Sequence, residues 1–160
     1  MHVDLYERVW MWIAAVLILC FLGAILFGVG SQATRPPSHI ETIDPKTVYD
    51  SEEFGSPGVR ETDDGRIIVS MVAEMFLFDP DEVVVPVGEP VTFRITSPDV
   101  IHGILVVGTN VNAMVIPGYV SEFSITFPEP GEYLMVCHEY CGLLHHEMMG
   151  TVIVEEGGAS

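Results

Sequence analysis

Residues 66–97, RIIVSMVAEMFLFDPDEVVVPVGEPVTFRITS, carry the pattern that decides the fold. Short runs rich in β-branched and aromatic residues alternate with turn sequences such as FDPDE at 78–82 and VGEP at 87–90. The alternation continues through the later runs HGILVVG, VSEFSITF, GEYLMVC and GTVIVEE. Such runs at a spacing of roughly ten residues, with no helical stretch between them, are typical of an all-β sandwich or barrel. We therefore predict one β domain over residues 66–156.

A long apolar run precedes this domain. Residues 9–29, VWMWIAAVLILCFLGAILFGV, contain 21 positions without a charge. At about 1.5 Å per residue, a helix of this length matches the thickness of a bilayer's hydrocarbon core. A cleaved signal peptide is the alternative, but Asp4 and Glu7 outnumber Arg8 before the run, and the run exceeds the roughly 7 to 15 residues of a signal core. We predict a retained transmembrane helix within residues 1–30, in which Cys20 is structural.

Residues 31–65 differ in composition from the apolar run before them and from the β domain after them. They are rich in Pro, Ser, Gly and acidic residues, and their isolated apolar residues follow no sustained period. This composition predicts a linker between the helix and the β domain. Residues 157–160 are predicted to be a short tail.

The charge of the chain is strongly one-sided. Its 23 acidic residues face 6 Lys and Arg, and only Asp4, Glu7 and Arg8 precede residue 31, so residues 31–160 carry 21 acids, 5 bases and a formal charge of −16. A nucleic-acid partner is excluded, because binding phosphates requires a basic surface. Self-repulsion of this kind is tolerated where salt screens it, which favours a salt-rich, halophilic environment. An acidic docking face is the alternative.

Soft metal ligands are concentrated in residues 137–150, CHEYCGLLHHEMMG. Cys137 is followed by Cys141, His145 and Met148, and His102 precedes them at the end of TSPDVIHG. Thiolates and imidazoles suit copper, zinc or iron–sulfur sites, and a thioether beside them points to copper rather than zinc. The pattern therefore predicts a copper site on a β-sandwich.

Several residues of this cluster have a plainer interpretation. Cys137 and Cys141 could form a disulfide, His102 could be an ordinary core histidine, and Met148 could simply pack. Phe76 and Phe78, in EMFLFDP, are expected to be core residues, and the alternative is that they flank the metal-binding loop. Three histidines compete for a single ligand role, namely His138, His145 and His146.

The cluster resembles a known family. CHEYCGLLHHEMMG resembles the copper-binding loop of cytochrome c oxidase subunit II, C-x-x-x-C-G-x-x-H-x-x-M, and ITSPDVIHG resembles the strand that brings that family's first histidine. GTNVNAMVIPG is similar to the segment between them, especially in the B-type branch, whose subunit II has one transmembrane helix. The resemblance implies a cupredoxin-like Greek-key β-sandwich. Transferred to this sequence, the family's copper ligands are the side chains of His102, Cys137, Cys141, His145 and Met148 and the backbone carbonyl of Glu139.

The resemblance also implies a cofactor, a possible magnesium ligand and a possible entry point for protons. Two copper ions would form a binuclear centre, termed CuA, and Met149 would be left to pack. The carboxylate of Glu139 could touch a magnesium ion, and Glu7 matches a carboxylate proposed to begin a proton-uptake path in B-type members. Both acids could equally be ordinary solvated carboxylates.

The implied function is that of an electron-entry subunit of a terminal heme-copper oxidase. An external donor, either cytochrome c or a small blue-copper protein, would reduce the dicopper site. Electrons would then pass to heme in subunit I, where oxygen becomes water. The chain would be a single-pass protein of the cell membrane with its dicopper domain on the extracytoplasmic side. Three alternatives are the CuA subunit of a nitric oxide reductase, a membrane-anchored mononuclear blue-copper carrier, and a copper-delivery protein.

Overall fold

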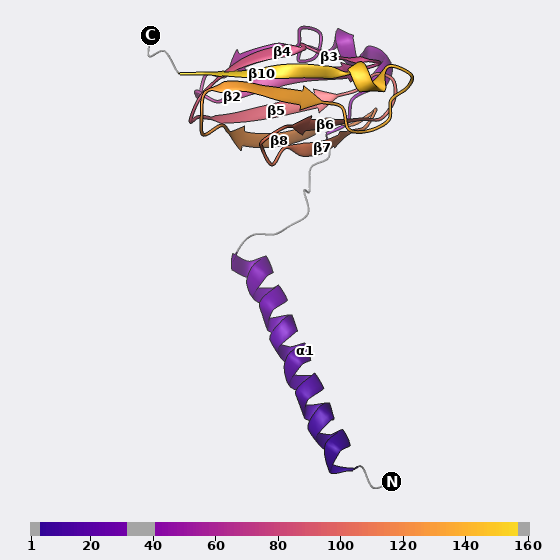
Figure 1. The fold of residues 1–160 in the computed structure, drawn as a ribbon, viewed down its shortest axis with the longest axis vertical. Coiled ribbons are helices and arrows are strands. Elements are labelled where there is room, and N and C mark those ends of the chain that lie inside the picture. Colours follow the sequence, from indigo (N-terminus) through magenta and orange to yellow (C-terminus); the bar gives the residue numbers. More distant parts are fainter. Residues whose placement is uncertain (1–3, 32–40, 157–160) are drawn as a thin grey trace. The chain divides into compact units, whose positions relative to one another are not determined.

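The computed structural model describes residues 4–31 and 41–156. The chain divides into two compact units, residues 1–39 and residues 40–160 (Figure 1). The predicted tail at 157–160 and the stretch 32–40 of the predicted linker lie outside the described residues.

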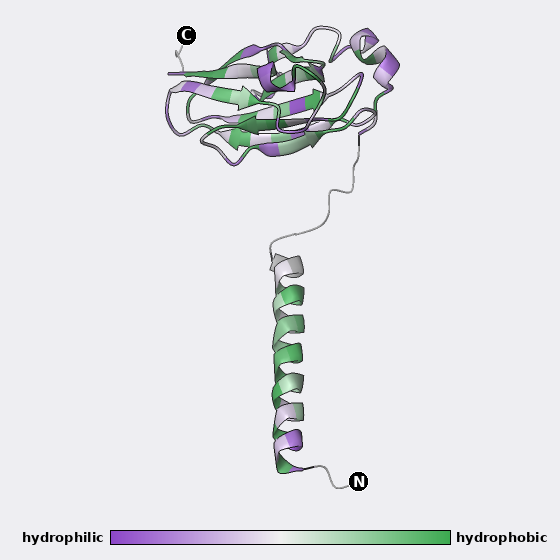
Figure 2. Ribbon diagram, turned by 45° about the vertical axis from the view of Figure 1, so that its right-hand side comes forward, coloured by the Kyte–Doolittle hydropathy of each residue, from purple (hydrophilic) through white to green (hydrophobic). Residues whose placement is uncertain are grey.

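The first unit contains one helix, α1, over Leu5–Ser31. Its part Leu5–Gly28 is long and apolar enough to cross a membrane, and hydrophobic residues predominate along the helix (Figure 2). A helix satisfies its own backbone polar groups, so this segment is compatible with a single-pass membrane anchor. Glu7 lies in the first turn.

The second unit is a sandwich of two mixed five-stranded sheets. The first sheet contains β1 (Gly58–Glu61), β2 (Ile67–Glu74), β5 (Pro90–Thr96) and β8 (Ser121–Thr126) in that order, with β3 (Leu77–Asp79) also paired to β2. The second sheet has the order β4 (Glu82–Pro86), β10 (Met149–Glu155), β9 (Gly131–Val136), β6 (His102–Val106) and β7 (Asn112–Val115). The chain passes repeatedly between the sheets, which is typical of Greek-key sandwiches. The predicted all-β class is confirmed.

Alternating residues of the strands build the core between the sheets. In β4, for example, Val83 and Val85 are buried while Val84 is exposed, as the two-residue period of a strand requires. Phe93 and Phe78 are among the largest fully buried side chains. Cys137, Cys141 and Met148 belong to the same buried cluster, so the candidate metal ligands are an extension of the core. The core therefore fixes their positions.

The folded unit begins well before residue 66, where we predicted its start. Residues Pro45–Asp50 form the 3₁₀ helix η1, and β1 pairs with β2. Val48 and Phe54 are buried against Val72, forming a second small core. Residues 41–61 are therefore part of the domain rather than a linker. Isolated apolar residues among Pro, Ser and Gly give no period, so their burial against the sheet is invisible in the sequence.

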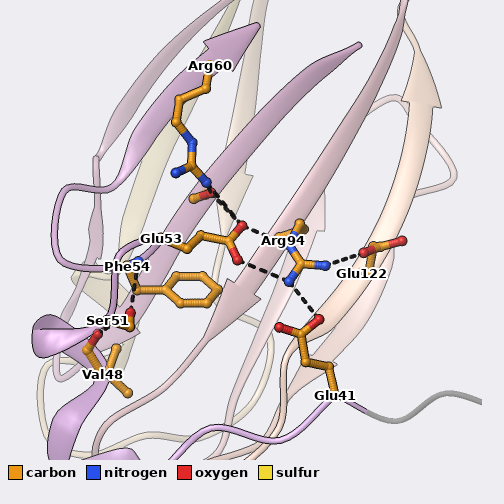
Figure 3. A network of polar contacts seen from close by, with 9 residues as sticks. Glu41, Val48, Ser51, Glu53, Phe54, Arg60, Arg94 and Glu122 are labelled. Carbon is orange, nitrogen blue, oxygen red and sulfur yellow. Dashed lines mark hydrogen bonds and ion pairs between the residues drawn. The ribbon is translucent and has the colours of Figure 1, made fainter. Parts of the chain in front are cut away.

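An ion-pair network holds this added segment on the first sheet (Figure 3). The guanidinium of Arg94 in β5 contacts Glu53 at 2.7 Å, Glu41 at 2.7 Å and also Glu122. Arg60 reaches Glu53 at 3.2 Å. Burial alone would raise the pKa of Glu53, but hydrogen bonds from Arg94 and Ser70 outweigh it and hold that pKa below its usual value. The carboxylate is therefore stabilised in its charged form.

Candidate metal centre

His102 is the first residue of β6 and is fully buried. The antiparallel register of β6 against β9 pairs Leu105 with Val136, so the chain that follows β9 runs along β6 toward its first residue, His102. Cys137 follows β9 directly, and its Sγ lies 3.9 Å from Nδ1 of His102. Two residues 35 positions apart in the chain thus meet because their strands are neighbours.

The remaining candidate ligands lie in the loop between β9 and β10. A backbone hydrogen bond of 3.1 Å from the Cys137 N–H to the Met148 carbonyl closes the loop. Within it, Sγ of Cys141 lies 3.6 Å from Nδ1 of His145 and 3.6 Å from Sδ of Met148. The ring of Tyr140 packs edge-on against His145 at 5.8 Å between centroids. The loop therefore gathers a thiol, an imidazole and a thioether at one place.

Glu139 contributes its backbone to this cluster. Its carbonyl oxygen lies 3.2 Å from Sγ of Cys137. Its carboxylate joins no group of three or more metal-binding side chains within the described residues, where His102, Cys137 and Cys141 form the only such group. The geometry thus favours the carbonyl role, and magnesium binding by Glu139 stays an untested prediction.

Of the three competing histidines, the structure brings only His145 to a thiol. The Nε2–H of His138 donates to the carbonyl of Ala113 at 3.2 Å, and its ring lies against Gly103. His146 is 69% exposed and pairs with Glu147. His145 thus lies beside Cys141, and its role as a metal ligand stays a prediction.

The donor set fits a soft metal. Three possible ligand atoms, one from each of His102, Cys137 and Cys141, all lie within 4.8 Å of one another, and the three residues are buried. Both cysteines are free thiols, so the disulfide alternative does not apply to this structure. Burial, reinforced by the neighbouring Cys137, raises the pKa of Cys141 to about 11, so a bound metal must displace a proton from this thiol.

Methionine packing differs from the prediction at one position. Met148 is 2% exposed and touches Cys141, as expected of a ligand or core residue. Met149 is 47% exposed, because β10 begins there and its first side chain points away from the core. Met149 was expected to pack, and with about half of its surface exposed it does so only in part.

The two aromatic residues of EMFLFDP have different surroundings. Phe78 is buried in the core, as predicted. Phe76 also packs against the core, but its ring additionally covers the loop at Gly142, where a Cβ would lie 2.7 Å from Cε1 of Phe76. Gly142 has a φ of 138°, which few residues other than glycine adopt. This glycine lets the aromatic ring contact the loop beside Cys141.

Asp99 also belongs to the site, although the sequence pattern does not predict it. The carboxylate of Asp99 accepts a hydrogen bond of 2.9 Å from Nε2 of His102. Burial acts to raise the pKa of Asp99, but the hydrogen bonds from His102 and from backbone N–H groups outweigh it and lower that pKa. An acid three positions before a candidate ligand, in SPDVIH, is the sequence signal that could have found it.

Comparison with known proteins identifies this arrangement. The model of the family described as "Cytochrome C oxidase subunit II, periplasmic domain" matches residues 61–156. The chain belongs to this family. A cytochrome c oxidase subunit 2 of Thermus thermophilus is 37% identical over 155 residues, covering 94% of this chain and 92% of that protein.

Solved structures agree with this membership in the subunit II family. A chain of a heme-copper terminal oxidase dimer, solved by cryo-electron microscopy, is 33% identical, covers 94% of this chain and 99% of that one, and superposes with a TM-score of 0.62. A second solved structure is the periplasmic domain of subunit II of cytochrome oxidase from Bradyrhizobium japonicum, which is 21% identical. The match covers 56% of this chain and 83% of that one, with a TM-score of 0.52. It supports the cupredoxin-like fold alone. As a subunit II, the chain is the electron-entry subunit of a heme-copper oxidase, and its partner is subunit I.

Proposed function

We propose that this chain receives electrons from an external redox protein at a binuclear copper centre and delivers them to the heme of subunit I. The observation that carries the proposal is the pair of buried thiols, Cys137 and Cys141, each beside an imidazole and a weak donor. A single blue copper needs one thiolate, so a second buried thiol favours two metals over the mononuclear alternative.

The family pattern assigns a role to each donor. His102 and Met148 would hold one copper, and His145 and the Glu139 carbonyl the other, with both thiolates shared between them. When bound, the two ions supply a one-electron redox couple spread over both metals. The chain itself fixes the donor atoms, because the hydrogen bond from Cys137 to Met148 closes the loop at its base. It also shields them from water, since Cys137 and Cys141 are only 7% and 5% exposed. This supports electron transfer with little structural rearrangement.

The apolar helix α1 suits a membrane anchor that holds the domain at subunit I. Its length and its apolar composition support a single-pass location in the cell membrane, with the β domain on the extracytoplasmic side. Electron donation by cytochrome c or a small blue-copper protein, and a proton-path role for Glu7, stay predictions within this proposal.

Copper stoichiometry and electron paramagnetic resonance of the copper-reconstituted chain test the proposal. Two coppers per chain and a seven-line hyperfine pattern are expected, because one unpaired electron would be shared by two equivalent copper nuclei. One copper per chain with a four-line pattern would instead establish the mononuclear carrier. Oxygen uptake, rather than nitric oxide consumption, by the complex purified with subunit I separates the oxidase from the nitric oxide reductase alternative, and a centre that releases its copper readily would indicate a delivery protein.

A further inference from the structure

The carboxylate of Asp99 is saturated with hydrogen bonds although it lies in a loop between β5 and β6. Its Oδ1 accepts from Nε2 of His102 at 2.9 Å and from Oγ of Ser97 at 3.0 Å, and also from the Val100 N–H. Its Oδ2 accepts from the Met75 N–H at 2.8 Å. The side chain is only 25% exposed. An ordinary surface acid keeps its oxygens in water, so this carboxylate serves an internal purpose.

The bond to His102 determines which ring nitrogen faces the thiols. A neutral imidazole carries its proton on one nitrogen, and the carboxylate of Asp99 requires that proton on Nε2. Nδ1 then keeps its lone pair, and Nδ1 is the nitrogen that lies 3.9 Å from Sγ of Cys137. A histidine with its outer nitrogen bound in this way is both oriented and made a better donor.

The bond to Met75 extends the effect to the other end of the site. Met75 precedes Phe76, whose ring contacts Gly142, the residue after Cys141. Asp99 is therefore linked directly to His102 and, through two residues, to the cover of the cysteine loop. The linked segments come from three separate parts of the chain, so their connection depends on the folded structure.

We propose that Asp99 is a positioning residue of the metal centre, which fixes His102 with Nδ1 toward the thiols and joins it to the Met75–Phe76 turn over the cysteine loop. The inference rests on the proposed copper function but goes beyond its ligand set. Asp99 itself touches no ligand position other than the outer nitrogen of His102 among the described contacts, and it acts through that histidine.

The copper-free, full-length chain in detergent offers a direct test without any substitution. In the ¹⁵N spectrum of labelled histidines, His102 should populate a single tautomer with the proton on Nε2. A proton on Nδ1, or a mixture of the two tautomers, overturns the proposal. This measurement does not depend on copper and therefore stands apart from the proposed function.

The substitution Asp99→Asn provides the second test in the same full-length chain. We expect two coppers still to bind but with an affinity lower by about 10- to 100-fold, the usual effect of losing an outer partner of a ligating histidine. His102 should then show both tautomers in the copper-free state, and the amide signal of Gly142 should shift.

Glu147→Gln is the matched control, since Glu147 is a 67% exposed acid of the cysteine loop whose ion-pair partner is His146. It removes the same charge and should leave the His102 tautomer and the copper affinity unchanged. If Asp99→Asn behaves like Glu147→Gln while the wild-type chain holds two coppers, the positioning role is refuted and the proposed function survives. If the wild-type chain binds one copper, the proposed function fails instead.

Discussion

Replacing Arg94 by methionine should detach the early segment of the domain from the first sheet. The guanidinium contacts three carboxylates, those of Glu41, Glu53 and Glu122, and methionine keeps most of the apolar stem while removing the charge. The side chains of Arg94 and Glu53 are 15% and 23% exposed, so Glu53 would lose its principal partner in a partly desolvated place.

The expected cost follows from these exposures. Breaking a fully buried ion pair by removing one partner costs about 3–5 kcal/mol, and the remaining access to water together with Arg60 lowers this to about 2–3 kcal/mol here. The side chains of Glu41 and Glu122 are each 55% exposed. Because solvent screens their contacts to Arg94, each contact contributes about 0–1 kcal/mol. We therefore expect a loss of about 3 kcal/mol in the free energy of unfolding.

Urea unfolding of the copper-free fragment 31–160, followed by circular dichroism, measures this loss. Arg66→Met is the matched control, since Arg66 and its partner Asp64 are 70% and 60% exposed and the pair should matter little. In the double variant Arg94→Met with Glu53→Gln, the loss should be smaller than the sum of the single losses, because no unpaired charge remains. If Arg94→Met costs no more than Arg66→Met, the network does not hold residues 41–61 in place.

Further outcomes follow from the site and from the charge. Cys141→Ser should abolish the delocalised mixed-valence signal, because a hydroxyl is a harder and far less acidic donor than a thiol; persistence of the signal would place the bridging ligand elsewhere. Met148→Leu should retain copper and raise its reduction potential, because a weak donor is lost and an apolar pocket remains. Met149→Leu should retain copper and leave the potential unchanged, since Met149 is 47% exposed and is not a ligand. Voltammetry of both variants measures the potentials, and a shift in Met149→Leu alone would mean that the loop register is wrong. The pKa of Glu53 is lower in the folded chain than its usual value of 4.5, so this carboxylate contributes stability above pH 4.5 and loses that contribution as the pH falls through the folded pKa. In Glu53→Gln, the free energy of unfolding should therefore decrease less steeply as the pH is lowered through this range. With a formal charge of −16 on residues 31–160, the unfolding free energy of the fragment should fall as salt is lowered from molar to millimolar, and a flat salt profile would favour a docking role for the acids.

Strands with strong internal patterns were predictable from the sequence, while weak edge elements were not. The runs around EVVVP and GTVIV correspond to β4 and β10, whose alternate valines fill the core. β1 and β7 escaped detection because each is four residues long and exposes much of its surface, so packing on a neighbour rather than its own pattern forms it. The burial of Val48 and Phe54 is likewise a tertiary effect that no local period announces.

The metal centre was predictable in its chemistry but not in its supporting contacts. Ligand types are dictated by the metal, so the two cysteines with nearby histidines and methionines could be recognised in one short loop. The choice of His145 among three histidines, and of Met148 over Met149, came from the family pattern. Their meeting with His102 depends on the pairing of β6 with β9, which spacing alone does not give. Asp99 was missed because its role lies in a hydrogen bond to the far side of a ligand, and an acid in a loop gives no sign of its partner.

Two of the few cations of the domain contact a partly buried acid. Within the described residues after the helix, they are Lys46, Arg60, Arg66 and Arg94. Two of the four contact the same partly buried acid, Glu53, while most other acids face solvent and keep their water. Salt screens charges in solvent but scarcely affects a desolvated pair. We therefore expect two separable effects, a local attraction that holds residues 41–61 on the sheet and a diffuse surface repulsion that salt would relieve.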